Sequence, residues 1–191
     1  MAQQPIFVPP VGEVDEVATL HGTLVEVLGM GVLLTGSSGC GKSDLALGLV
    51  DRGHRLVADD QVAFRVVNGQ LVGSSPLGGA GFIEIHGLGV VNLARLYGEQ
   101  VLCQALPLGL VLALKTADDV PRVLGERLHC QQRDWAYLGV SVKEVLLPCG
   151  RGRDLPLLVE TAVRLSRHWQ QGHDDAAEFE VKLSAFWEGR P

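Results

Sequence analysis

The chain has 191 residues, of which 47% are hydrophobic, 20% charged and 5% aromatic. These proportions are typical of one globular domain with a buried core, and they exclude a disordered, collagen-like or coiled-coil chain. There are 16 basic and 22 acidic residues, which gives a formal charge of −6. Because the sequence also has no basic cluster, nucleic acid is not an expected partner.

The sequence also indicates where the protein works and how many domains it has. No apolar run approaches the roughly 20 residues that a membrane span needs, and residues 1–10 lack the charged-then-apolar order of a signal peptide. We therefore expect a cytoplasmic protein with no membrane partner. The proline-bearing residues 1–20 are expected to be an irregular lead-in, and residues 21–191 to form a single domain, since neither a repeat nor a linker follows.

The cysteines suggest neither disulfides nor a zinc site. They show no CxxC spacing, and the chain is long enough to fold without covalent cross-links. Each is expected to behave as a small, buried or half-buried apolar side chain, except Cys40, which its position within a glycine-rich turn sets apart. They are Cys40, Cys103, Cys130 and Cys149.

The first regular elements are expected to be two strands and a helix. Residues 23–28 and 32–35 are short apolar runs with branched side chains, separated by glycines, which predicts two strands. Residues 43–52 carry apolar side chains at helical spacing, and Gly53 follows directly as a helix stop. A glycine-rich turn at 36–41 joins the second strand to this helix.

The next part of the chain is predicted to contain strands and then a loop. Residues 55–58 read as a strand that ends at two aspartates, and residues 62–66 alternate before Asn68-Gly69, the strongest short signal for a hairpin. Residues 73–89 are so rich in glycine that we expect a mobile loop with a chemical purpose.

The second half is predicted to end in two helices. A strand is expected over 108–114, whereas residues 118–143 give no clear pattern. After a basic, glycine-bearing loop, Asp154 is placed to cap a helix with one apolar face. The apolar side chains expected on the two helices are Leu155, Leu158, Val159, Ala162 and Val163 on the first, and Phe179, Leu183, Phe186 and Trp187 on the second. Strands alternating with helices favour a single α/β domain.

The strongest chemical motif is G-x-x-x-x-G-K-[ST], which the chain matches completely between a predicted strand and a predicted helix. Its glycines let backbone N–H groups point at phosphate oxygens, and the start of the helix adds positive charge. The lysine is expected to reach the outer phosphates and the serine to ligate Mg²⁺. The expected nucleotide-binding residues are Gly36, Ser37, Ser38, Gly39, Cys40, Gly41, Lys42 and Ser43.

Two adjacent acids, Asp59 and Asp60, follow a predicted strand one helix and one turn after Lys42. That is where a phosphate-loop protein places carboxylates for the metal or for the attacking group. One acid could hold Mg²⁺, directly or through water, while the other accepts the proton of an incoming hydroxyl, because neighbouring acids can have different surroundings. Taken alone, the pair would be read as a solvated acidic turn.

Further polar candidates are less specific. Glu84 lies between apolar neighbours on an alternating segment, where it either faces solvent or points into a site. His86 shares its face, although a lone histidine is more often structural than catalytic. Arg151 and Arg153 would suit a phosphate or an acidic partner through their forked donors, although such a loop is usually a solvated surface.

Taken in order, these pieces resemble the carboxy-terminal catalytic domain of HPr kinase/phosphorylase, the bacterial serine kinase with a phosphate loop. The resemblance runs from about His21 to the final helix. It rests on the phosphate loop together with five further segments: His21-Gly22, residues 52–60, residues 84–92 for the family's E-I-R-G-x-G-[IV]-[IV]-N, Arg127-Leu128, and Pro148 to Arg153 for P-x-x-x-G-R.

The resemblance implies a P-loop kinase domain of mixed sheet and flanking helices that transfers phosphate from ATP, with Mg²⁺, to a serine of HPr. HPr is the phosphocarrier of the sugar phosphotransferase system, and inorganic phosphate would reverse the reaction. A homo-oligomer, a hexamer in the family, is also implied. The implied roles are phosphate binding for Lys42, metal binding for Ser43 and Glu84, the base for Asp60 of the Asp59-Asp60 pair, catalysis for His21 and Arg127, and dephosphorylation for the loop ending at Arg153.

The chain departs from the family pattern at two points. His86 stands where the family has arginine, so the reverse reaction or the protein substrate is expected to differ. About twenty residues precede His21, so the amino-terminal domain of longer members is not expected. Two alternatives remain open: a kinase of this fold acting on another protein or a small hydroxyl compound, and an ATP sensor that recruits a partner through residues 73–81 without transferring phosphate.

Overall fold

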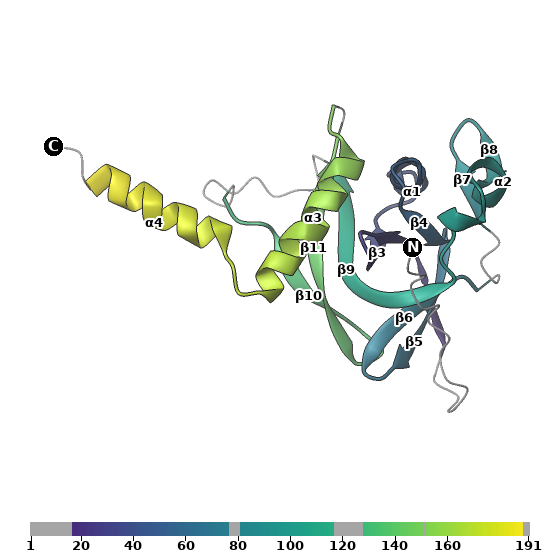
Figure 1. Cartoon of the computed structure of the whole chain (residues 1–191), viewed down its shortest axis with the longest axis horizontal. Helices are drawn as coiled ribbons and strands as arrows, with labels where there is room; N and C mark the ends of the chain where they lie inside the picture. Colours follow the sequence, from purple (N-terminus) through teal and green to yellow (C-terminus); the bar gives the residue numbers. More distant parts are fainter. Residues whose placement is uncertain (1–16, 77–80, 117–127, 151, 189–191) are drawn as a thin grey trace, which may run out of the picture.

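The computed structural model describes residues 17–76, 81–116, 128–150 and 152–188 (Figure 1). Within these ranges no helix is both long and apolar enough to span a membrane. The elements in chain order are β1 (Ala18–His21), β2 (Thr23–Val27), β3 (Met30–Thr35), α1 (Lys42–Asp51), β4 (Arg55–Ala58), β5 (Gln61–Val67), β6 (Gln70–Ser74), β7 (Phe82–Ile85), β8 (Gly89–Asn92), α2 (Leu93–Tyr97), the short 3-10 helix η1 (Glu99–Val101), β9 (Ala105–Thr116), β10 (Gln132–Tyr137), β11 (Val140–Cys149), α3 (Leu155–Gln170) and α4 (Asp175–Glu188).

Strand β9 organises the main sheet because it pairs with three other strands along its length. Its first residues pair antiparallel with β6, which continues to β5 and β1. Its later residues pair parallel with β3 on one side and β11 on the other, and these continue to β2 and β4 and to β10. Figure 1 shows the strong curvature of β9 that lets one strand serve both parts. The predicted α/β class, with a mixed sheet and flanking helices, is confirmed.

Strand direction brings several connections to one edge of the sheet. Strands β3, β9 and β11 are parallel to one another, and β4 has the same direction because both it and β3 are antiparallel to β2. The carboxyl ends of these strands therefore lie at the same edge, where α/β folds commonly bind ligands. The phosphate-loop motif follows β3, and the aspartate pair follows β4. The beginning of β2, directly after His21, lies at this edge as well.

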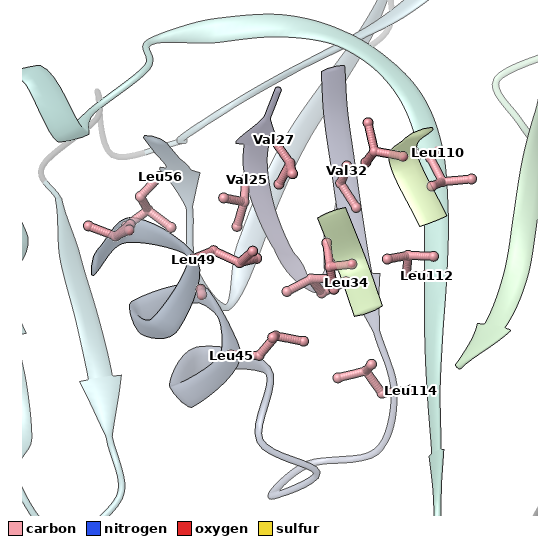
Figure 2. Close-up of a cluster of buried hydrophobic side chains, with 14 of the residues drawn as sticks. Val25, Val27, Val32, Leu34, Leu45, Leu49, Leu56, Leu110, Leu112 and Leu114 are labelled. Carbon is pink, nitrogen blue, oxygen red and sulfur yellow. The ribbon is translucent and has the colours of Figure 1, made fainter. Parts of the chain in front are cut away.

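The core lies on both faces of the central strands. Helices α1 and α3 cover one face, where leucines of α1 pack against valines and leucines of β2, β3 and β9 (Figure 2). The second face packs against the curled part of the sheet around the fully buried Phe64. Central strands with two covered faces need apolar residues at nearly every position, as the runs in β2, β3 and β9 have. Leu45, near the start of α1, and Leu114, near the end of β9, both belong to this core cluster.

Two stretches of the chain differ from the sequence-based expectations. Residues 18–20, expected to be irregular, belong to β1, because their backbone pairs with β5. Much of the glycine-rich stretch 73–89 is regular rather than a mobile loop: it contains the end of β6 and the hairpin of β7 and β8. That hairpin forms because Ile83 and Ile85 are buried in the α1 face of the core, a tertiary contact that glycine content does not reveal.

Ion pairs join the helices to the rest of the domain. Glu160 of α3 is buried and accepts two hydrogen bonds from Arg52, at 2.9 and 3.0 Å, and lies 3.0 Å from Nε2 of His54. Helix α4 extends away from the body of the molecule, and none of its residues is buried. Its Glu180 lies 2.9 Å from His129, an exposed pair.

Candidate active site

The loop that follows β3 exposes its backbone. Gly39 and Gly41 have φ angles of +77° and +90°, in the left-handed region that favours glycine, and a Cβ added at either position would meet no atom within 4 Å. Their peptide groups therefore border open space. Helix α1 begins at Lys42, directly after Gly41, so its unpaired N–H groups and the positive end of its dipole face the same space. These features suit a phosphate group.

Lys42 is only 8% exposed, although it carries an ammonium group. Its Nζ donates to the carbonyl oxygens of Gly36 and Ser37, both at 3.2 Å. Neutral carbonyl partners satisfy the donors without cancelling the positive charge, so the lysine is held against the loop with its charge available to an anion.

Cys40 occupies a variable position of the motif and is half-buried. Burial raises the pKa of the Cys40 thiol, while the nearby Lys42 ammonium acts in the opposite direction. The thiol is therefore neutral at physiological pH and adds no negative charge that would repel a phosphate.

Asp59 brings three segments of the chain together. Its carboxylate accepts a hydrogen bond from the hydroxyl of Ser43, with distances of 3.2 and 3.1 Å to its two oxygens. The hydroxyl of Thr23 donates to the same carboxylate at 2.7 Å, and the backbone N–H of Glu84 donates to it at 3.4 Å. An acid directly on the serine of a phosphate loop is the arrangement that holds Mg²⁺ in such proteins.

Asp60 points in another direction and has a different partner. Its Oδ1 lies 3.0 Å from Nδ1 of His21, and both side chains are largely exposed, at 73% and 49%. Its φ of +65° is left-handed, a conformation that aspartate adopts more readily than most residues and that often marks functional positions. The N–H of Gly22 donates to the carbonyl of Asp60 at 3.1 Å and fixes this turn. The two neighbouring acids thus have distinct surroundings: one faces the phosphate loop and the other is open to a large molecule.

The remaining predicted residues have different positions. Glu84 is an exposed residue of β7, and His86 is an exposed residue of the turn that follows this strand. Arg153 donates from Nη1 to the carbonyl of Pro148 at 2.9 Å, so its guanidinium folds back on its own loop. Arg127 and Arg151 lie outside the described residues.

Sequence reasoning missed the roles of Thr23 and Gly22. Thr23 is completely buried, and its hydroxyl orients Asp59. The signal for it was a polar residue at the start of a largely apolar strand. Gly22 passes so close to β3 that a Cβ there would lie 2.9 Å from the carbonyl oxygen of Leu34. The segment His21-Gly22-Thr23 therefore contacts both aspartates, with a glycine where no side chain fits.

The residues fit a magnesium-bound nucleotide. In the part of the chain that the structure describes, no group of three or more His, Cys, Asp or Glu side chains is arranged to hold a metal ion. Mg²⁺ in phosphoryl-transfer sites commonly takes only one or two protein ligands and completes its coordination with phosphate oxygens and water. Ser43 and Asp59 supply hard oxygen atoms of that kind beside the exposed backbone of the loop.

These features define an α/β phosphate-loop protein. A strand is followed by an open, glycine-bearing loop and then by a helix that starts with lysine and serine, and a carboxylate contacts that serine. The family model for the HPr Serine kinase C-terminal domain matches residues 13–183. The chain belongs to this family.

Individual relatives agree with this assignment. The chain is 39% identical over 184 residues to the HPr kinase/phosphorylase of Aromatoleum aromaticum, covering 94% of this chain and 57% of the relative. It is 41% identical over 166 residues to the HPr kinase/phosphorylase of Caldanaerobacter subterraneus, covering 86% of this chain and 54% of that one. The chain therefore spans a little over half the length of these curated relatives.

A solved structure, that of the Hpr(Ser) kinase/phosphatase from Coxiella burnetii, has the same fold. It aligns with a TM-score of 0.77 and 37% sequence identity, and the alignment covers 85% of this chain and 98% of the other. The resemblance inferred from the motifs is confirmed at the level of family and fold.

Proposed function

We propose that this chain is an ATP- and Mg²⁺-dependent protein serine kinase that transfers the γ-phosphate of ATP to a serine of HPr, and that inorganic phosphate reverses the transfer. The observation that carries the proposal is the pair of contacts made by the two adjacent acids, Asp59 to Ser43 and Asp60 to His21. A phosphate-loop kinase needs one carboxylate at the metal and another at the acceptor hydroxyl. The contact of Asp59 with Ser43 suits the first role, and the contact of Asp60 with His21 suits the second.

The chain's own residues bind and orient the phosphates. The backbone of the loop and the start of α1 would hold the phosphate chain, and Lys42 would contact the phosphate that moves. Ser43 and Glu84 would ligate Mg²⁺, and Asp59, which accepts a hydrogen bond from Ser43, would orient that serine and hold the metal directly or through water. When bound, the metal supplies positive charge against the charge that builds up on the phosphate oxygens.

Asp60 would act as the base. Its carboxylate would take the proton of the acceptor serine as the serine oxygen forms its bond to the γ-phosphorus and the bond from that phosphorus to ADP breaks. His21 would hold the Asp60 carboxylate in place through the 3.0 Å contact. In the reverse direction, an oxygen of inorganic phosphate would bond to the phosphorus of phosphoserine and form pyrophosphate, while the bond from that phosphorus to the serine oxygen breaks. Asp60 would pass a proton from the inorganic phosphate to the serine oxygen. Arg153 would serve this dephosphorylation, and Arg127 would serve catalysis. High exposure at Asp60 suits an acceptor carried on a protein surface.

Two further features belong to the proposal, and the first rests on family resemblance. The first is assembly as a homo-oligomer, a hexamer in the family. The second is cytoplasmic location, where ATP and HPr would both be available. Neither nucleic acid nor a membrane has a part in the proposed reaction.

The test is incubation of the purified chain with Mg²⁺, γ-labelled ATP and HPr, using as matched control an HPr whose acceptor serine is replaced by alanine. The proposal predicts label on the serine of HPr and none on the control. Label on another protein or a small hydroxyl compound, but never on HPr, would replace the substrate. Nucleotide binding with no transfer to any acceptor would favour the sensor.

A further inference from the structure

The hairpin of β7 and β8 presents apolar side chains to solvent on the face that carries Glu84. Residues of β7 alternate between buried and exposed, so Phe82 and Glu84 share the outer face. On β8, Val90 is paired directly with Glu84, so both side chains project from the same face with their Cβ atoms about 5 Å apart. Phe82, Leu88 and Val90 are 49%, 73% and 68% exposed. We name these three residues the hairpin patch.

The opposite face of the hairpin explains why the patch keeps its position. Ile83 and Ile85 are 1% and 5% exposed and belong to the same core cluster as the leucines of α1. The backbone N–H of Glu84 donates to the Asp59 carboxylate at 3.4 Å, which joins β7 to the acidic turn. Packing of the opposite face of the hairpin therefore keeps Phe82 and Val90 beside the candidate active site.

We infer that the hairpin patch is the docking surface for the folded protein that donates the acceptor serine, a partner with an apolar surface next to that serine. This inference rests on the proposed function and deepens it. Exposed apolar side chains clustered beside a polar site commonly mark an interaction surface. Here the patch flanks a proposed metal ligand, so a protein that brings its serine to this site also covers the patch.

Two other occupants fit less well. A small hydroxyl compound is too small and too polar to cover side chains distributed over a hairpin, which spans roughly 13 Å for four residues of strand. A second copy of this chain seated permanently on the patch would cover Glu84, which lies opposite Val90, and so would obstruct the approach of any acceptor. A patch of three exposed side chains suits a partner that binds transiently over a modest contact area.

The test compares Val90→Ser with Val17→Ser. Val17 is a matched control because it is 64% exposed and precedes β1 at the end far from His21, so it lies away from the site. Steady-state kinetics with HPr as acceptor and direct measurement of HPr and nucleotide affinity would be made for both variants and the wild type. Phe82→Ser is the second variant, and a thermal melt reports whether each variant is folded.

We expect Val90→Ser to raise the KM and the Kd for HPr about tenfold, since one buried valine contributes about that factor. Its kcat should change less than its KM, and its affinity for ATP should match that of the wild type. Val17→Ser should behave as the wild type does. Phe82→Ser should raise KM at least as much.

Two results would overturn the inference while leaving the kinase proposal intact. One is an unchanged KM for HPr in folded Val90→Ser and Phe82→Ser proteins. The other is a variant that loses its oligomeric state by sedimentation while its affinity for HPr stays the same, which would assign the patch to contact between copies. Wild-type protein that never phosphorylates HPr would refute the proposed function, and this inference with it.

Discussion

Replacing Glu160 by glutamine should destabilise the fold by removing the charge that joins α3 to the end of α1. The carboxylate is 7% exposed and accepts two hydrogen bonds from Arg52 and one contact from His54. Breaking a buried charge pair commonly costs about 3–5 kcal/mol. Because Arg52 is 38% exposed and solvent weakens its share, we expect a loss of about 2–3 kcal/mol.

The effect should depend on pH in a defined direction. Hydrogen bonds from Arg52, followed by those from His54, lower the pKa of Glu160 from its ordinary value of 4.5 to about 2. A carboxyl group with a lowered folded-state pKa stabilises the protein above its unfolded-state pKa, and this contribution is lost as the pH falls towards the folded-state value. The difference between wild type and Glu160→Gln should therefore be constant near neutrality, shrink below about pH 4.5 and nearly vanish towards pH 2.

Urea unfolding at pH 7 and pH 3 measures both quantities, with Glu180→Gln as the control. Glu180 pairs with His129 at 2.9 Å, but both side chains are 48% exposed, so its replacement should cost less than about 0.5 kcal/mol. At pH 7 the Glu160→Gln variant should also melt at a temperature roughly 5–10 °C lower than that of the wild type. A loss under about 0.5 kcal/mol at pH 7, or a loss of the same size at pH 3, would refute the reasoning.

Three more changes test the site and its surroundings. Gly22→Ala should destabilise the fold by about 1–3 kcal/mol in urea unfolding, since its Cβ would lie 2.9 Å from the carbonyl oxygen of Leu34. A variant as stable as the wild type would show that β2 shifts freely. Asp59→Asn should raise the Mg²⁺ concentration needed for half-maximal activity about tenfold, because Asp59 orients Ser43, and an unchanged requirement would exclude that role. His86→Arg should raise activity towards HPr in a phosphotransfer assay by restoring a permanent charge; no change or a fall would indicate adaptation of His86 to another acceptor.

Local signals predicted the elements around the phosphate loop well. The apolar run before the motif and the helical spacing after it gave β3 and α1, with bounds within about one or two residues of the structure. Asn68-Gly69 marked the hairpin of β5 and β6, and both residues have the positive φ angles that such a turn requires.

Other turns carried no comparable signal. The hairpin of β10 and β11 turns at Leu138-Gly139, where Leu138 has a φ of +47°. Leucine rarely adopts that conformation, so no local signal indicated the turn, and tertiary pairing of β11 with β9 determines it. The pairing of β9 with strands distant in the sequence is likewise a result of packing, and no local pattern predicts it.

The candidate site was predictable in its members and not in its arrangement. The motif and the acidic pair were evident, but only the family resemblance, and no property of the residues themselves, distinguished Asp59 from Asp60. The distinction comes from Thr23, which holds Asp59 towards Ser43, and from the left-handed backbone of Asp60, which turns its side chain to His21. These contacts join residues up to 39 positions apart, as with His21 and Asp60, and depend on the direction of β2 beside β4.

The most direct measurement of the central claim is phosphotransfer by Asp60→Asn, made together with its affinity for ATP. If the Asp60 carboxylate takes the proton of the acceptor serine, phosphoserine on HPr should fall to background, while the Kd for ATP stays within about tenfold of the wild type, since a base contributes mainly in the transition state. Equal rates of phosphoserine formation by wild type and variant would contradict the account and assign the base to another group.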